Sequence, residues 1–347
     1  MRDVRRVYVL GAGSSRFPGY PLAPGLWSFV RDRCSGHIMA MTRRDDVIAA
    51  MENIIRVDPP LDYDQPNLEE LFTLLDLSIL IPHEFQLRHA DWKNLRPKVT
   101  GLIADAFVTY QSDLGRAVYE REKAVDDVAV DPNLVRATLD AWVARVRTGD
   151  VIISFNWDLL HEAALWRAGK WSYRDGYGFP CRDDVTAAES TVHFYKLHGS
   201  VNWAQHGPQD VEVEVVDKSH FFPGALDGDD VYLKERGQWD DARKLIIPTY
   251  LKTVSSNALL VRLWNKAAVA LRCAEEIVVV GYRLHPADSA AHYLFATALA
   301  DNRRCRQVQV VSPGGPSQDT WDALCAGASL PSPVRIRKRF EEWVLAA

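Results

Sequence analysis

The stretch Val7-Tyr8-Val9-Leu10-Gly11-Ala12-Gly13-Ser14-Ser15 decides the fold. Its first four residues form an apolar run that predicts a buried strand, and the glycines after it predict a tight turn at the end of that strand. Dinucleotide-binding proteins bring their backbone close to a pyrophosphate at such a strand-to-loop turn. The sequence therefore predicts an α/β fold with a nucleotide pocket at this turn.

Two further polar segments also follow apolar runs. They are Ser154-Phe155-Asn156-Trp157-Asp158 and Lys196-Leu197-His198-Gly199-Ser200. Open α/β sheets carry their chemistry at such positions, just beyond the ends of strands. We therefore take Asn156, Asp158 and His198 as candidate catalytic residues.

Each of these residues also has a purely structural interpretation. Asn156 and Asp158 are typical of a turn or a helix cap, and His198 beside a glycine is typical of a hydrogen-bonded loop. Asp32 lies about 20 residues beyond the glycine loop, as a ribose-binding acid would, but no second strand precedes it. The joint occurrence of the three segments in one order favours the functional interpretation.

The composition describes a globular chain without a nucleic-acid surface. The 347 residues are 47% hydrophobic, and 41 basic against 46 acidic side chains give a net charge of -5. The densest basic cluster, 335–339, is short, and we interpret it as a solvated strand end. Apolar stretches such as 277–280 are too short to cross a membrane, so we expect a cytoplasmic protein.

The sequence predicts no metal site. Its five cysteines are scattered without a Cys-x-x-Cys pair, which favours buried free thiols over disulfides or a zinc site. His161-Glu162 resembles the start of a zinc-protease motif, but Leu165 stands where the second histidine would be. Gly-x-Ser-x-Gly and Walker motifs are also absent from the sequence, so serine hydrolases and nucleoside triphosphatases lack their usual markers.

The pattern along the chain predicts one α/β domain with an insertion. Helical periodicity covers 47–55, 68–81, 99–118 and 134–146. Beyond it, strands are predicted over 151–154, 192–197, 276–280 and 307–311, helices over 158–167, 256–272, 286–300 and 317–326, and an exposed hairpin strand over 211–215. This alternation predicts a doubly wound parallel sheet. Within a single domain, 1–347, we expect 1–25 and 148–347 to form a Rossmann-like core and 26–147 a helical insertion.

Short motifs in this order resemble those of sirtuins. They are Gly11-Ala12-Gly13-x-Ser15-x-x-x-Gly19-x-Pro21, Asn156-x-Asp158, His198-Gly199 and Gly281-Tyr282-Arg283-Leu284. The chain resembles more closely the sirtuin-like branch of bacterial antiviral defence, which carries motifs similar to 68–75 and 196–203. The similarity spans nearly the whole chain.

Two departures separate this chain from sirtuin deacylases. Those enzymes follow Gly-x-Pro with Asp-Phe-Arg, whereas Leu22-Ala23-Pro24 stand here, and they carry a four-cysteine zinc ribbon that this chain cannot build. The resemblance to the defence branch implies instead an NAD+ glycohydrolase, which releases nicotinamide and ADP-ribose and starves infected cells of NAD+. ADP-ribosyl transfer, deacylation and a non-catalytic module that senses NAD or a related nucleotide remain alternatives.

The residues fit this chemistry, because cleavage passes through an oxocarbenium-like state and nicotinamide leaves neutral. Asn156 would hold a water or the ribose hydroxyls, His198 would accept a proton, and Asp158 would orient the carboxamide or stabilise developing positive charge. The Ser15 side chain and the backbone amides of 11–14 would hold the pyrophosphate. The expected NAD contacts are Gly11, Ala12, Gly13, Ser14, Ser15, Gly19, Pro21, Gly281, Tyr282 and Ser312.

Control of such an enzyme is expected to come from the state of assembly or from the helical insertion closing the pocket. A constantly active NADase would deplete its own host, and the sequence shows no inhibitory domain. We expect a homo-oligomer, and the resemblance implies a separate trigger such as a HerA-type ATPase or an Argonaute-like subunit. Residues around Trp92 and the loops over 205–240 are the expected contact surface.

Overall fold

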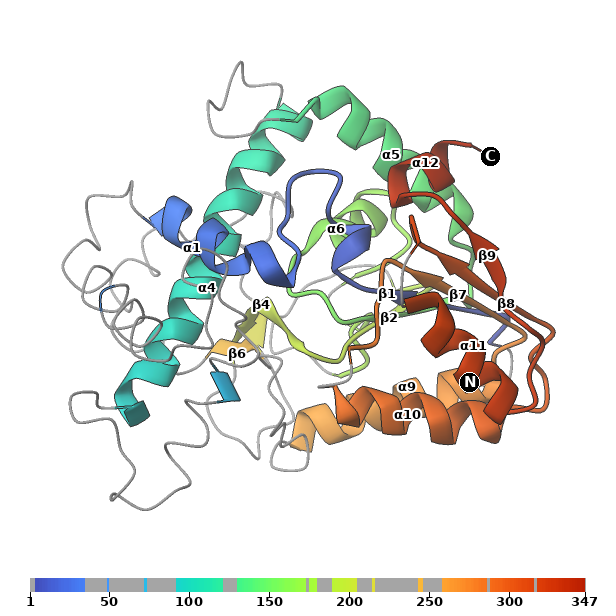
Figure 1. Cartoon of the computed structure of the whole chain (residues 1–347). Helices are drawn as coiled ribbons and strands as arrows, with labels where there is room; N and C mark the ends of the chain where they lie inside the picture. The colour runs from blue at the N-terminus through green and yellow to red at the C-terminus, as the bar shows by residue number, and fades with distance from the viewer. Residues whose placement is uncertain are drawn as a thin grey trace, which may run out of the picture.

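Six parallel strands form the central sheet in the described part of the chain (Figure 1). The computed structural model describes residues 4–34, 49, 72–73, 92–120, 130–172, 175–179, 189–204, 214–215, 243–245, 258–285, 288–314 and 317–346. The strands are β1 (Arg6–Leu10), β2 (Val151–Ser154), β3 (His193–Lys196), β7 (Glu276–Val280), β8 (Gln307–Val311) and β9 (Val334–Ile336). The expected helices over 47–55 and 68–81 and the loops over 205–240 lie almost wholly outside these residues.

The strands run in the order β3-β2-β1-β7-β8-β9. Numbered along the chain within this sheet, that is the order 3-2-1-4-5-6 of Rossmann folds. The central strands read as continuous apolar runs, since both of their faces are covered, and β2 is buried at all four residues. The direction of winding reverses between β1 and β7, so the loops that follow these two strands diverge and leave a crevice at the carboxyl edge.

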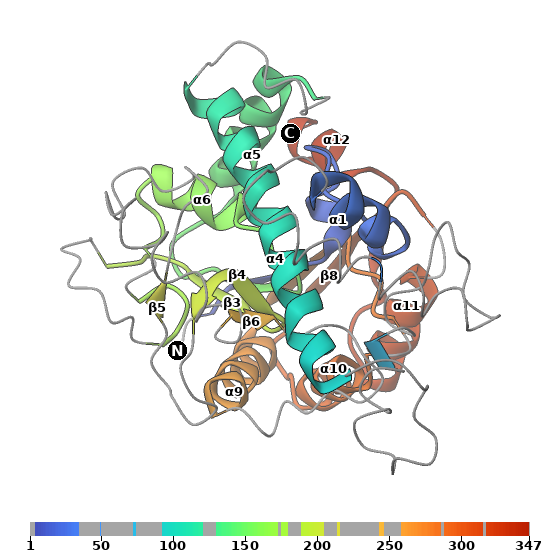
Figure 2. The same cartoon turned by 90° about the vertical axis from the view of Figure 1, so that its left-hand side faces the viewer.

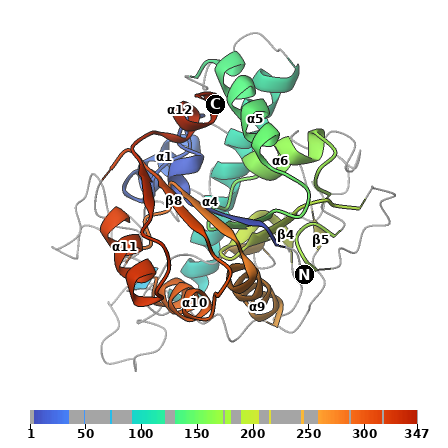
Figure 3. The same ribbon diagram turned by 90° about the vertical axis from the view of Figure 1, so that its right-hand side faces the viewer.

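Helices cover both faces of the sheet, as the alternating sequence predicted (Figures 1 and 3). On one face lie α9 (Ala258–Cys273), α10 (Ser289–Ala300) and α11 (Ser317–Gly327), with α10 packed between the other two. On the other face lie α5 (Pro132–Arg145), α6 (Leu160–Arg167) and α12 (Phe340–Leu345), with α5 packed against both partners. The protein is therefore a doubly wound α/β protein.

The segment between β1 and β2 contributes helices beside the carboxyl edge. There α1 (Leu26–Cys34) packs on α4 (Trp92–Gly115), which crosses in front of the strands in Figure 2 and continues as a π-helical turn, Arg116–Glu120. The long helix also touches a small antiparallel sheet of β4 (Gly199–Ala204), β5 (Glu214–Val215) and β6 (Arg243–Leu245). The side chain of Trp92 lies outside the described part of the chain.

Several elements differ from the sequence-based expectation for physical reasons. The strand predicted over 192–197 is confirmed as β3, but β4, which starts at Gly199, was not predicted; the φ of 76° at Gly199 permits the sharp turn from β3 into β4. The edge strand β9 escaped prediction because its side chains are mostly exposed and form no apolar run. Of the strand expected over 211–215, residues 214–215 form β5, which pairs with Trp203 and Ala204 of β4, and 211–213 lie outside the described residues.

Candidate functional site

A pocket of about 790 Å³ opens at the carboxyl edge of the sheet, where β1 and β7 part. Its volume lies within the range of small-molecule sites, roughly 300 to 1,000 Å³. The lining consists of Ala12, Gly13, Arg16, Phe17, 22–24, Phe155, Asn156, His198, 281–285, Asp288, 311–314 and 338–341. Loops that follow six different strands or turns thus meet in one concave site.

Three glycines allow the loop after β1 to lie directly against the loop after β7. A Cβ on Gly13 would come within 2.7 Å of the Gly281 Cα, and one on Gly281 would come within 2.5 Å of the Gly13 carbonyl carbon. A Cβ on Gly11 would stand 2.5 Å from the Tyr282 Cα. Gly281 also has a φ of 61°, which disfavours other residues. Gly13 and Gly281 line the pocket, and their close backbone packing forms its floor.

The backbone amides of the glycine loop are largely bonded within the protein. Gly11 N donates to Val280 O at 3.1 Å, Gly13 N to Gly281 O at 3.0 Å, and Ser14 N to Gly11 O at 2.8 Å. Each of these three donors already has a carbonyl partner, so none of them is available to a pyrophosphate in this conformation. The loop contributes its shape and the exposed Ala12 instead.

Asn156 is tied to the glycine loop through its side-chain nitrogen. Its Nδ2 lies 3.1 Å from Gly11 O, 3.2 Å from Ser14 Oγ and 3.0 Å from Ser15 Oγ. The side chain also lines the pocket. Because the two ends of a carboxamide point in different directions, holding the nitrogen on the loop leaves Oδ1 as the end that meets a ligand. The geometry makes Asn156 a hydrogen-bond acceptor toward the pocket.

Six of the predicted site residues lie outside the pocket lining: Gly11, Ser14, Ser15, Gly19, Pro21 and Asp158. Ser14 and Ser15 are buried beneath the loop, and Ser14 Oγ donates to Gly11 O at 2.8 Å and contacts His161 Nε2 at 3.1 Å. Asp158 accepts a hydrogen bond from Leu160 N at 3.1 Å near the start of α6. Burial raises the pKa of its carboxyl, against the effect of the Lys196 charge. Asp158 thus makes a buried hydrogen bond to the first residue of α6, one position ahead of its N-cap Leu159.

Gly19 lies in the turn between β1 and α1. Its φ is 99°, and a Cβ there would collide with the Tyr110 hydroxyl of α4. That hydroxyl donates to the carbonyl of Pro18. This glycine therefore reflects a close helix–loop contact rather than a ligand contact.

A buried ion pair supports the loop that carries Asn156. Lys196 Nζ lies 2.6 Å from Glu162 Oε1, and both side chains are at most 1% exposed. The same ammonium donates to the carbonyls of Trp157, at 3.2 Å, and Asp158. Burial raises the pKa of Glu162 to about 7, while the charge of Lys196 opposes the rise. Loss of one partner would leave an uncompensated buried charge, a cost of about 3 to 5 kcal/mol.

His198 faces a carboxylate that sequence reasoning missed. Its Nε2 lies 3.1 Å from Asp288 Oδ2, and the two side chains are 8% and 6% exposed. Tyr282 OH donates to the same Oδ2 at 3.3 Å, and Asp288 Oδ1 accepts from Ala291 N at 3.2 Å as the N-cap of α10. From the sequence alone Asp288 signals only a helix start. The contact of Asp288 with His198 depends on the packing of α10 beside the loop between β3 and β4.

Aromatic side chains form the wall between these polar groups. Phe155 stacks on Tyr282 with ring centroids 4.0 Å apart and planes 6° apart, and His198 meets the edge of Phe155 at 5.0 Å. On the opposite side Phe17 packs against Phe340 of α12 at 5.4 Å. All of these residues line the pocket. The site thus pairs apolar walls with a small number of polar groups, as small-molecule sites do.

Four exposed cations stand at the rim of the pocket: Arg16, Arg283, Lys338 and Arg339. The cluster over 335–339 is therefore only partly the solvated strand end that the sequence suggested, since β9 ends at Ile336 and the next turn leads over the pocket. Ser312, expected as an NAD contact, also lines this end and accepts from Gly314 N at 3.2 Å. The rim is suited to an anionic ligand.

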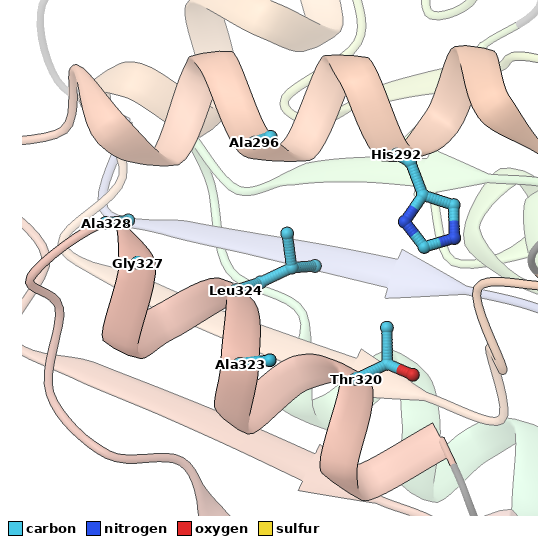
Figure 4. Close-up of a pocket in the computed structure, with 7 residues that line it drawn as sticks. All are labelled: His292, Ala296, Thr320, Ala323, Leu324, Gly327 and Ala328. Atoms are coloured by element: carbon cyan, nitrogen blue, oxygen red, sulfur yellow. The ribbon is translucent and has the colours of Figure 1, made fainter.

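Outside this pocket, the depressions among the described residues have fewer ionisable side chains. A depression of about 430 Å³ between α10 and α11 has His292 as its ionisable group beside small and apolar side chains (Figure 4). Within the described ranges, no cluster of three or more His, Cys, Asp or Glu side chains could hold a metal ion. Among the helices described, none has both the length and the apolar character needed to cross a bilayer.

Fold and site together define a Rossmann-like α/β protein with a pocket of small-molecule size at its switch point. No protein-family model matches the chain, and neither does any curated protein.

Proposed function

We propose that this chain is a sirtuin-like NAD+ glycohydrolase that cleaves NAD+ to nicotinamide and ADP-ribose. One observation carries the proposal: Asn156 and the His198–Asp288 pair line a single pocket at the switch point of the sheet. Rossmann folds bind dinucleotides at this point. The order of motifs along the sequence, which resembles the sirtuin-like branch, supports the same activity.

The chemistry needs little beyond these residues. The bond between the nicotinamide nitrogen and C1′ of the ribose breaks, and its electron pair leaves with the nitrogen, so no acid is required. Water then forms the new bond to C1′ and gives its proton to His198. Positioned proton acceptors of this kind contribute typically ~10²- to 10⁴-fold. The oxygen of Asn156 accepts a hydrogen bond from the water or from a ribose hydroxyl and so fixes its orientation.

The pocket is long enough for an extended dinucleotide. Asn156 and His198 follow β2 and β3, whereas Ser312 and Lys338 follow β8 and β9 at the far end. From β2 to β9 there are four strand spacings, or roughly 19 Å. With nicotinamide at the His198 end, the adenosine would lie toward Ser312, and the pyrophosphate would pass the rim cations. Asp158, Ser14 and Ser15 would act from beneath by supporting Asn156.

The test is product analysis with purified protein. We expect NAD+ to give free nicotinamide and ADP-ribose, with one ¹⁸O from labelled water in the ADP-ribose. Asn156→Ala and His198→Ala should each lower turnover by about 10²-fold or more while the protein stays folded. His292→Ala, in the depression of Figure 4, is the matched histidine control and should keep full turnover.

Other outcomes would identify the alternatives. ADP-ribose attached to protein would replace hydrolysis by transfer. Movement of the acyl group from an added acyl-peptide to ADP-ribose, with release of the deacylated peptide, would replace it by deacylation. Tight NAD+ binding without any product would indicate a nucleotide-sensing module. Near wild-type turnover in either site variant would contradict the assigned chemistry.

The biological setting follows from the resemblance alone. We propose an effector that depletes NAD+ during antiviral defence and that is activated by self-association or by a separate subunit such as a HerA-type ATPase or an Argonaute-like protein. Turnover per protomer should then rise with protein concentration alongside sedimentation of larger species. A fully active monomer at every dilution would remove this part of the proposal.

A further inference from the structure

Asp288 places a carboxylate against the ring of His198, although the two residues are far apart in the sequence. The 3.1 Å separation of Nε2 and Oδ2 lies within hydrogen-bonding range. Both side chains are buried, so water screens this contact little. The contact therefore strongly favours the form of the imidazole in which Nε2 carries a hydrogen.

A carboxylate can only accept hydrogen bonds, so the nitrogen that faces it carries the ring hydrogen. In a neutral imidazole the other nitrogen then holds the lone pair. We propose that Asp288 is a positioning residue that keeps the hydrogen of His198 on Nε2 and so makes Nδ1 the atom that takes the proton from the attacking water. This role rests on the proposed NAD+ hydrolysis.

The carboxylate is itself held in place by its own loop and helix. Tyr282 OH donates to Oδ2, and the Ala291 amide donates to Oδ1. The backbone N of Asp288 donates to His285 O at 2.8 Å. One side chain thus joins the start of α10 to the proposed base, with little rotational freedom left.

Helix capping alone does not require a charge at this position. Asparagine caps helices about as well as aspartate, so Asp288→Asn keeps the cap and removes the carboxylate. Asp131 offers a matched control, since it caps α5 by accepting from Asn133 N at 2.9 Å and does not line the pocket. Asp131→Asn therefore makes the same substitution at the same kind of helix position away from the site.

Other charged groups around the pocket stay unchanged in this comparison. They are Arg16, Arg283, His285, Lys338, Arg339 and Glu341. A difference between the pH profiles of the wild type and Asp288→Asn therefore reports on the removed carboxylate.

The kinetic test measures kcat, KM and the pH profile of NAD+ cleavage. We expect Asp288→Asn to lower kcat by about 10²-fold with KM nearly unchanged. The midpoint of the acidic limb should move down by about 1 pH unit, because the imidazolium loses a neighbouring negative charge. Asp131→Asn should match the wild type. In a His198→Ala background, Asp288→Asn should have no further effect, since it acts through the missing ring.

Equal kinetics for Asp288→Asn and Asp131→Asn would overturn the proposal, and so would effects of Asp288→Asn and His198→Ala that multiply. Imidazole ¹⁵N NMR gives a readout that needs no turnover, with the His198 signals assigned by their loss in His198→Ala. The proposal requires the Nε2–H form in the wild type and its loss in Asp288→Asn. The Nδ1–H form in an active wild type would refute it while NAD+ hydrolysis stands. An inactive wild type with the expected tautomer would refute only the hydrolysis.

Discussion

Gly281→Ala tests the contact on which the pocket floor depends. The substitution adds one methyl group where the loop after β7 meets the loop after β1, with 2.5 Å to both the Gly13 carbonyl carbon and the Ser14 nitrogen. Carbon atoms in contact normally lie about 3.5 to 4.0 Å apart. Since both neighbours are backbone atoms, no side-chain rotation can relieve the overlap, and the two loops must separate.

The expected loss of stability has two separable parts. A left-handed backbone costs about 1 to 2 kcal/mol for a residue with a Cβ. Overpacking in a tight contact costs typically about 1 to 3 kcal/mol more. Gly169→Ala measures the backbone cost alone, because the φ of 68° at Gly169 is close to the 61° of Gly281 and a Cβ on Gly169 meets nothing within 4 Å. Gly13→Ala measures the cost of steric overlap alone, since its added Cβ would lie 2.7 Å from the Gly281 Cα.

Urea unfolding followed by tryptophan fluorescence measures these differences, with the free energies extrapolated linearly to water. We expect destabilisation of about 1 to 2 kcal/mol for Gly169→Ala, about 1 to 3 for Gly13→Ala and about 2 to 5 for Gly281→Ala. The Gly281 variant should also lose NAD+ turnover, because its pocket floor is displaced. Equal destabilisation by Gly169→Ala and Gly281→Ala would refute the described packing of the two loops.

Two further predictions concern charge. Lys338→Ala at the rim should raise KM for NAD+ about 2- to 5-fold with kcat retained, and the increase in KM should be smaller at high salt. Arg303, which is also exposed and lies beyond α10, is the control, and Arg303→Ala should leave KM unchanged. A fall in kcat of Lys338→Ala would argue against a simple anion contact. Burial, aided by the Lys196 charge, lowers the pKa of His161 to about 3. As the pH falls, the imidazole therefore becomes protonated in the unfolded chain before it does in the folded one, and the stability of the protein decreases below about pH 6.5. Between pH 6.5 and 5 the wild type should lose about 2 kcal/mol relative to His161→Gln in urea unfolding, and parallel pH dependences of the two proteins would contradict a neutral buried imidazole.

Local sequence patterns determined the secondary structure of the core and much of the site. The strands predicted over 151–154, 276–280 and 307–311 coincide with β2, β7 and β8. The reason is that a strand buried on both faces must be apolar at every position, which is visible in the sequence itself. The position of Asn156 and His198 just after strands likewise placed both at the carboxyl edge, and both line the pocket.

Tertiary structure alone decided which groups at that edge are available to a ligand. The loop amides looked like anion donors in the sequence, but strand pairing sets Gly13 against Gly281 and bonds its amide to a carbonyl from β7's loop. Asp158 looked catalytic from its place beside Asn156 and is buried outside the lining, whereas Asp288, which no sequence motif marks, faces His198. Local sequence encodes the conformation of a few neighbouring residues. The partner of a polar side chain depends on which distant strands and helices pack together, and that packing is a property of the whole folded chain.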